Sequence, residues 1–213
     1  KSFIRPRLFE IQECIVIFSK FWTRLVIVLA AGHVAFSSAF AEEVSLGDIE
    51  APITLIEYGS LTCSKCIHFH KQVYPQIKKH YIDTGSVRFI YRHFPTSGAA
   101  VEAARAADCA GGRYYEMVDA LFATVADWYQ ADSRDAIFEK QAATFGLDSD
   151  EFQACIGDEK HLDRILSEQQ ASRKELDIIG TPTFFINGKA VRGKRSFAEM
   201  EVLISEALNN KDH

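Results

Sequence analysis

Apolar residues follow two patterns along the chain, short apolar runs typical of strands and a spacing of three to four residues typical of helices, and these predict alternating strands and helices. The run 53–58 (ITLIEY) is short, β-branched and mostly apolar, which indicates a strand buried on both faces. Between residues 66 and 81 an apolar residue returns at every fourth position, as on one helix face. Residues 87–91 (VRFIY) alternate into a second strand. These three segments predict a parallel strand–helix–strand unit with a right-handed crossover.

The pattern is helical throughout residues 96–177. Within this range the periodicity predicts helices over 99–110, 113–129, 133–145, 148–155 and 160–175. The strand pattern then returns at 183–186, where Asn187-Gly188 favours a two-residue hairpin turn into a short second strand. Residues 196–208 are predicted to form the closing helix.

This change of pattern predicts an α/β chain with an inserted part. Residues 42–95 and 178–213 are interpreted as one α/β domain, and residues 96–177 as an α-helical domain inserted into it.

The first 41 residues differ in kind from the rest. Basic residues precede the short apolar run 25–31, and Ala39-Phe40-Ala41 precedes two glutamates. This order is typical of a secretory signal peptide, with cleavage expected after Ala41. The alternative is an uncleaved membrane anchor, but Gly32 and His33 leave the apolar run short for a span.

Composition narrows the classes of function. Lysine and arginine total 24 against 29 aspartates and glutamates, for a net charge of −5. No basic run forms a nucleic-acid footprint, so no nucleic-acid partner is expected. Four of the five cysteines follow the predicted signal, an even number in a chain sent to an oxidising compartment.

Two of these cysteines form the motif Cys63-Ser64-Lys65-Cys66, between the first predicted strand and its helix. A thiol at a helix start meets unpaired backbone N–H groups and the positive end of the helix dipole, which stabilise a thiolate. Cys63 precedes the helix and is expected to be the exposed nucleophile, with Cys66 shielded one turn inside. A bare C-x-x-C also fits half of a zinc site.

The stretch Ile179-Gly180-Thr181-Pro182 lies more than a hundred residues later, immediately before the predicted hairpin. A proline at a strand's first residue removes a donor where a sheet tolerates the loss. The C-x-x-C motif at a strand–helix junction, combined with this distal Thr-Pro, resembles the thioredoxin superfamily. The long interval between them resembles its DsbA-like branch, the bacterial extracytoplasmic thiol–disulfide oxidoreductases, and the match covers residues 45–208.

The resemblance implies a thioredoxin fold with an inserted α-helical domain, and roles for several residues. Cys63 and Cys66 would form the redox-active disulfide, Cys63 entering the mixed disulfide and Cys66 resolving it. Pro182 is expected to be cis and to lie against this disulfide, and the backbone at Thr181–Pro182 would pair with an extended substrate peptide.

Two charged residues near the motif are candidate contributors. Lys65 stands where the best-known DsbA proteins have histidine, and its charge is expected to lower the pKa of Cys63. The alternative is a solvated surface lysine. Glu57 lies six residues before Cys63 within a buried strand, which resembles the buried acid that assists proton transfer at the resolving cysteine. Its alternative is a carboxylate that reaches solvent.

His68 and His70 follow the motif, so a zinc or copper cluster with the two cysteines is a further alternative. Positions two and four beyond Cys66 point to different sides of a helix. Both histidines are therefore expected to be partly exposed, and no metal or other cofactor is expected.

Cys109 and Cys155 both fall in the helical segment, away from any C-x-x-C partner. In an oxidising compartment the simplest interpretation is a structural disulfide between them. Their local contexts also resemble a cysteine pair of α-proteobacterial DsbA-like proteins. Two free buried thiols are the alternative.

The resulting hypothesis is a monomeric periplasmic oxidoreductase that donates the Cys63–Cys66 disulfide to reduced secreted polypeptides. A membrane quinone reductase of the DsbB kind would reoxidise it. The alternatives are an isomerase or reductase kept reduced by another system, and a metal-binding module such as a copper chaperone that uses the same thiols.

Overall fold

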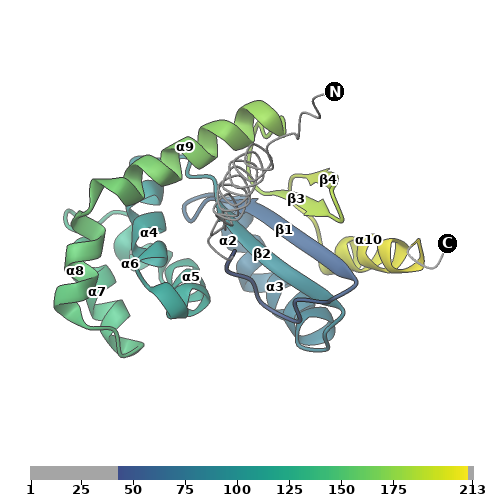
Figure 1. Cartoon of the computed structure of the whole chain (residues 1–213), viewed down its shortest axis with the longest axis horizontal. Helices are drawn as coiled ribbons and strands as arrows, with labels where there is room; N and C mark the ends of the chain where they lie inside the picture. Colours follow the sequence, from purple (N-terminus) through teal and green to yellow (C-terminus); the bar gives the residue numbers. More distant parts are fainter. Residues whose placement is uncertain (1–42, 211–213) are drawn as a thin grey trace, which may run out of the picture. The chain divides into compact units, whose positions relative to one another are not determined.

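A four-stranded mixed sheet lies at the centre of the computed structural model, which describes residues 43–210 (Figure 1). Its strand order is β2–β1–β3–β4. Strands β1 (Ile53–Gly59) and β2 (Val87–His93) are parallel, whereas β3 (Thr183–Ile186) runs antiparallel to both β1 and β4 (Lys189–Arg192). The central strand β1 therefore joins segments that are far apart in the sequence.

The register of β1 and β3 decides what lies beside the cysteine motif. Tyr58 pairs with Thr183, and Leu55 pairs with Ile186. The first residue of β3 thus meets the end of β1 that leads to Cys63. The hairpin between β3 and β4 turns at Asn187 and Gly188, which both have positive φ, as such a two-residue turn requires.

One long helical segment follows the cysteine motif, as the periodicity predicted. It consists of α2 (Ser64–His68), the π-helical turn η1 (Phe69–Val73), α3 (Tyr74–Ile77) and a second π-helical turn, η2 (Lys78–Ile82). The first wide turn comes just before Pro75, whose ring has no N–H and would crowd the carbonyl four residues earlier. Helix α10 (Phe197–Asn209) packs against α3, β1 and β3.

Between β2 and β3 the chain is helical, as predicted. The elements are α4 (Gly98–Asp108), η3 (Gly111–Arg113), α5 (Tyr114–Ala123), α6 (Val125–Trp128), α7 (Asp135–Thr144), α8 (Ser149–Gly157) and α9 (Glu159–Glu175).

The prediction of one continuous helix over 113–129 is wrong. Thr124 leaves helical geometry, with φ −103° and ψ 17°, and its hydroxyl donates a hydrogen bond to the Ala120 carbonyl 2.8 Å away. The break redirects the chain so that Trp128 is fully buried and its indole N–H donates to the Leu121 carbonyl. A buried tryptophan that needs a partner outweighs the helical periodicity here.

A large cluster of buried apolar residues runs through the sheet and the helices, and a smaller one contains Tyr58, Phe94 and Ile178. The large cluster includes Phe69 from η1, Phe184 from β3 and Phe122 from α5. Within residues 43–210, no helix combines the length and the apolar character needed to cross a bilayer. The predicted signal peptide, residues 1–41, lies outside the described residues.

Candidate active site

Cys63 and Cys66 lie where the chain passes from β1 into α2. Cys63 is the N-cap residue of α2 and is partly buried, whereas Cys66 is fully buried one turn later. Both are free thiols in this structure. The expectation that Cys63 is the more exposed of the two is confirmed, so an incoming thiol meets the sulfur of Cys63 first.

The loop before β3 lies against this junction. The Cys63 thiol donates a hydrogen bond to the Thr181 carbonyl, with 3.4 Å between sulfur and oxygen. The following Thr181–Pro182 peptide bond is cis, and Pro182 is buried. The pairing of β1 with β3 therefore brings these two sequence motifs together at one site.

The two thiols differ in acidity. The pKa of Cys63 is lowered to about 5. The largest cause is a hydrogen bond from the Cys66 thiol, partial burial opposes it, and a hydrogen bond with the Thr181 side chain lowers the pKa further. Burial raises the pKa of Cys66 well above its ordinary value, and the neighbouring Cys63 and Glu57 raise it further. Cys63 is therefore a thiolate at neutral pH beside a protonated thiol, which suits nucleophilic attack by Cys63.

Lys65 contributes to the acidity of Cys63 through its backbone. Its side chain is exposed, and its backbone N–H is among the groups that lower the pKa of Cys63, together with the N–H of Cys66. These N–H groups point out of the first turn of α2 and have no carbonyl partner within the helix.

Glu57 and His70 form a buried pair beneath the junction. Glu57 is fully buried on β1, so the alternative in which it reaches solvent does not hold. Its Oε2 atom lies 2.9 Å from Nε2 of His70. The expectation that His70 is partly exposed is wrong, since only 7% of the residue is accessible, whereas His68 is partly exposed as expected.

The burial of His70 could have been predicted from its spacing in the sequence. His70 follows the buried Cys66 by four positions, and residues four apart lie on the same helix face. The face that carries Cys66 toward the sheet therefore carries His70 as well.

Four hydroxyl groups fix the loop in front of Cys63, and the sequence analysis missed them. Ser60 bonds Thr96 at 2.9 Å, and Thr62 bonds Ser97 at 3.0 Å between their side-chain oxygens. Ser97 is also the N-cap of α4, where its hydroxyl accepts from the Ala100 N–H. Isolated serines and threonines carry no periodic signal, so only the fold reveals this link to the helical segment.

Cys109 and Cys155 are bonded to each other, with 1.99 Å between their sulfurs. The bond joins the C-terminal end of α4 to α8. Nε2 of His161 lies 3.4 Å from the Cys155 sulfur. Among the residues that the structure describes, these three form the only close group of histidine, cysteine or acid ligands, and bonded sulfurs offer no thiolates to a metal.

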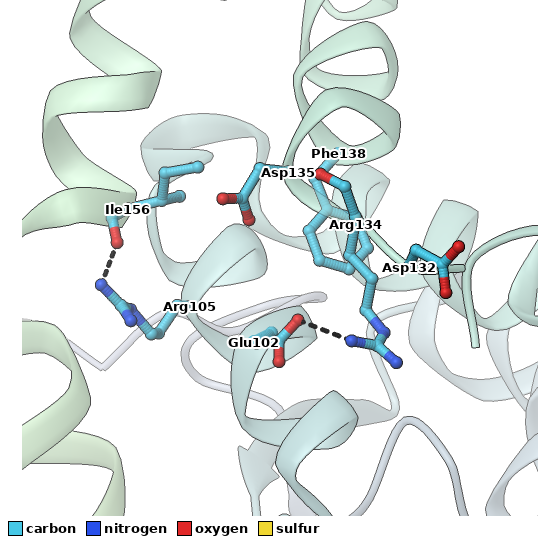
Figure 2. Close-up of a pocket in the computed structure, with 8 residues that line it drawn as sticks. Glu102, Arg105, Asp132, Arg134, Asp135, Phe138 and Ile156 are labelled. Carbon is cyan, nitrogen blue, oxygen red and sulfur yellow. Dashed lines mark hydrogen bonds and ion pairs between the residues drawn. The ribbon is translucent and has the colours of Figure 1, made fainter. Parts of the chain in front are cut away.

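A polar cavity of about 320 Å³ lies in the helical segment, and none of the four cysteines lines it (Figure 2). The Arg105 guanidinium donates to the Ile156 carbonyl, and the Arg134 guanidinium donates to Glu102 at 3.0 Å. These contacts occupy the two arginines with groups of the protein itself. Because none of these four cysteines lines the cavity, it is separate from the thiol site.

Comparisons with known proteins show the family to which the chain belongs. The thioredoxin family model matches residues 40–206. The crystal structure of α-DsbA1 from Wolbachia pipientis is 32% identical, has a TM-score of 0.74, and matches 80% of this chain and 92% of that one. The structure of BdbD from Bacillus subtilis is 20% identical with a TM-score of 0.68, over 78% of this chain and 93% of that chain, which shows the shared fold.

A relative from Rickettsia conorii, provisionally named a protein-disulfide oxidoreductase, is 24% identical over 171 residues, which make up 79% of this chain. This chain spans 61% of the length of that relative. The family match covers both sequence motifs and the sheet that joins them. The chain therefore belongs to the thioredoxin family and, within it, to the DsbA-like proteins.

Proposed function

We propose that the protein is a thiol–disulfide oxidoreductase that introduces disulfides into reduced secreted polypeptides by exchange through a Cys63–Cys66 disulfide. One observation carries this proposal. A partly exposed thiol whose pKa is lowered to about 5 lies beside a buried thiol whose pKa is raised. This asymmetry provides one sulfur for attack and one that is shielded from outside thiols.

The exchange requires two displacements at sulfur. A substrate thiolate attacks Cys63, the Cys63–Cys66 bond breaks, and Cys66 leaves with the electron pair and takes up a proton. A second substrate thiolate then attacks the substrate sulfur of the mixed disulfide. Cys63 leaves as a thiolate, the substrate is oxidised by two electrons, and the Cys63–Cys66 pair is reduced.

The acidity of Cys63 favours the oxidising direction. A low pKa stabilises the thiolate of the reduced protein, so the disulfide form gives up its bond more readily. The same low pKa makes Cys63 a good leaving group in the second displacement. Thiolate stabilisation therefore favours an oxidase over a reductase that is kept reduced.

The substrate would bind along the loop at Thr181–Pro182. Ile179, two residues before Thr181, is 76% exposed, and Leu176 is 40% exposed. Apolar side chains next to a backbone segment at the start of β3 suit an extended peptide that pairs with the main chain. The Thr181 carbonyl already lies 3.4 Å from the Cys63 sulfur, so a peptide held there has its thiol within reach.

The cellular setting belongs to the same proposal. After cleavage behind Ala41 the protein would be a periplasmic monomer, and a DsbB-like membrane quinone reductase would restore the disulfide. Residues 96–177 would be a helical insertion between the two parts of a thioredoxin-like domain, 42–95 and 178–213. The link between Thr62 and Ser97 supports a role for the insertion in fixing the active-site loop.

A single-turnover reaction tests the proposal. The purified oxidised protein is mixed with an excess of a reduced peptide that contains two cysteines, and the products are followed by mass spectrometry after acid quenching. The proposal predicts peptide disulfide and reduced Cys63–Cys66 in equal amounts, with no product from Cys63→Ser. A peptide that stays reduced, or product that still forms with Cys63→Ser, would exclude this function.

A further inference from the structure

Glu57 and His70, which lie before and after the cysteine motif in the sequence, are hydrogen-bonded to each other. Glu57 precedes Cys63 on β1, and His70 follows Cys66 in η1. Oε2 of Glu57 and Nε2 of His70 are 2.9 Å apart, and the two side chains are 0% and 3% exposed. Their other polar atoms, Oε1 of Glu57 and Nδ1 of His70, are buried and have no partner in the protein.

Aromatic rings close the pair off from water. Phe122 from α5 stacks on the His70 imidazole, with 3.8 Å between ring centroids and 12° between planes. Tyr91 from β2 and Phe69 each meet the same ring edge-on at 5.5 Å. Phe122 belongs to the helical segment, Tyr91 to the sheet, and Phe69 to the same π-helical turn as His70, so the imidazole has little freedom to turn away from Glu57.

A buried pair of this kind retains a proton. An isolated charge is costly in such surroundings, so the pair is stable as carboxylate with imidazolium or as carboxylic acid with neutral imidazole. These two states differ only by the position of one proton along the 2.9 Å hydrogen bond.

The pair acts on the sulfur that must exchange a proton. The charge of Glu57 is among the groups that raise the pKa of Cys66, after burial and hydrogen bonding with Cys63. Cys66 takes up a proton when the disulfide opens and gives it up when the disulfide closes. Cys66 is fully buried, so that proton does not come directly from bulk water.

We infer that His70 is a positioning residue that keeps Glu57 supplied with the proton exchanged at Cys66. This inference rests on the proposed function for its role in the cell. When the disulfide opens, Cys66 takes the electron pair of the S–S bond and the one proton of the pair, which passes from Nε2 of His70 to Glu57 and from Glu57 to Cys66. The pair is left as a carboxylate with a neutral imidazole until a proton from solvent restores it, and closure runs in reverse. His70 is hydrogen-bonded to Glu57 and acts through it.

The other titratable groups near the imidazole are few. Tyr91 from β2 and Tyr74 from the same helical segment have pKa values raised by burial, so both stay neutral. On α5, Asp119 is exposed at the surface, where partial desolvation of its carboxyl raises its pKa and the charge of His70 opposes that rise. Phe122 carries no charge. The ionisable groups that act on the imidazole are therefore Glu57, which is hydrogen-bonded to it, and Asp119.

The test uses the small disulfide reagent dithiobis(nitrobenzoate), so it requires no polypeptide substrate. Attack of Cys63 on this reagent releases one coloured thiolate in a phase that depends on reagent concentration. Attack of Cys66 on the mixed disulfide releases a second in a concentration-independent phase. Stopped-flow absorbance between pH 5 and 9 thus separates the step at Cys63 from the step that moves the proton of Cys66.

The variants are His70→Gln, which keeps an N–H donor but cannot ionise, and His70→Phe, which keeps a flat ring. His68→Gln, on the same helix but partly exposed, is the matched control. We expect both His70 variants to slow the second phase by at least about tenfold near neutral pH and to change its pH profile, because general acid–base contributions are of this size or larger. The first phase and the control should match the parent.

An unchanged second phase in folded His70→Gln would overturn the inference. A second phase that slows equally at every pH, or a first phase that slows in parallel, would also overturn it, because a merely structural disturbance acts in that way. Circular dichroism establishes folding, and His70→Gln suffices if His70→Phe does not fold. Since the reagent reports the thiols directly, this outcome is independent of whether the protein oxidises polypeptides.

Discussion

The sulfur of Cys63 lies 3.4 Å from the carbonyl oxygen of Thr181, although 118 residues separate them in the chain. The pairing of Tyr58 with Thr183 produces this contact, because it places the start of β3 beside the end of β1. The reactive sulfur and the backbone segment proposed to hold a peptide are therefore fixed to each other by the sheet. Loop flexibility alone would not give that geometry.

The acidity of Cys63 can be measured directly. In the reduced protein, alkylation of Cys63 by iodoacetamide should follow a titration with its midpoint at about 5, because only the thiolate reacts. The rate should fall as the pH drops through that value and stay level above it. Cys66, with its raised pKa and full burial, should remain unmodified over the same range. Peptide mapping after timed quenching gives both rates, and a Cys63 midpoint near 8.5, as in a free cysteine, would contradict this account.

The separate roles of the two cysteines predict different behaviour of their serine variants. Mixed with a peptide that carries one disulfide, Cys66→Ser should accumulate a covalent adduct at Cys63, because no internal thiol displaces the peptide. Cys63→Ser should form none, since Cys66 is fully buried. Non-reducing electrophoresis and intact mass distinguish the two results. An adduct on Cys66 of the Cys63→Ser variant would reverse the assignment.

The disulfide between Cys109 and Cys155 is expected to stabilise the fold and to leave the thiol site unaffected. It closes a loop with a sequence separation of 46 residues. A loop of this size corresponds to roughly 4 kcal/mol of unfolding free energy in the chain-entropy model, near the upper end for such bonds. Cys109→Ala/Cys155→Ala should therefore lower the Tm by roughly 8–16 °C in calorimetry. The Cys63 alkylation profile should stay unchanged, and a shifted midpoint would show that the bond also tunes the active site.

Ile179 should contribute to substrate binding. Ile179→Ser removes an exposed apolar side chain beside Thr181, and a partial loss of its burial against a peptide corresponds to about 1 kcal/mol. We expect KM for a reduced peptide to rise about fivefold, with kcat unchanged. Val202→Ser is the matched control, because Val202 is 56% exposed on α10, away from the cysteine motif. An equal effect from both variants would argue against a peptide site at Ile179.

The sequence predicted those features that depend on local patterns. The junction of β1 and α2 at Cys63, the turn at Asn187-Gly188 and the helical character of 96–177 all follow from short-range periodicity and turn chemistry. Helix 113–129 was predicted as one piece because periodicity carries no information on the partner that the Trp128 indole requires.

The pair of Glu57 and His70 was missed for a similar reason. Each residue was assessed within its own element, whereas their contact depends on how β1, η1 and α5 pack together. The contact between Glu57 and His70 joins different elements, and single-sequence patterns do not encode it. For Lys65 the structure shows the contribution of its backbone N–H to the lowered pKa of Cys63, and the effect of its side-chain charge stays a prediction.

The reduction potential of the Cys63–Cys66 pair tests the central claim most directly. The protein is equilibrated with graded ratios of reduced and oxidised glutathione, and the thiols are trapped by acid and counted by alkylation and mass. A pair whose thiolate is stabilised as at Cys63 should have a potential less negative than about −200 mV, in the oxidising range for such proteins. A potential near about −270 mV, typical of a reductant such as thioredoxin, would contradict the proposed function.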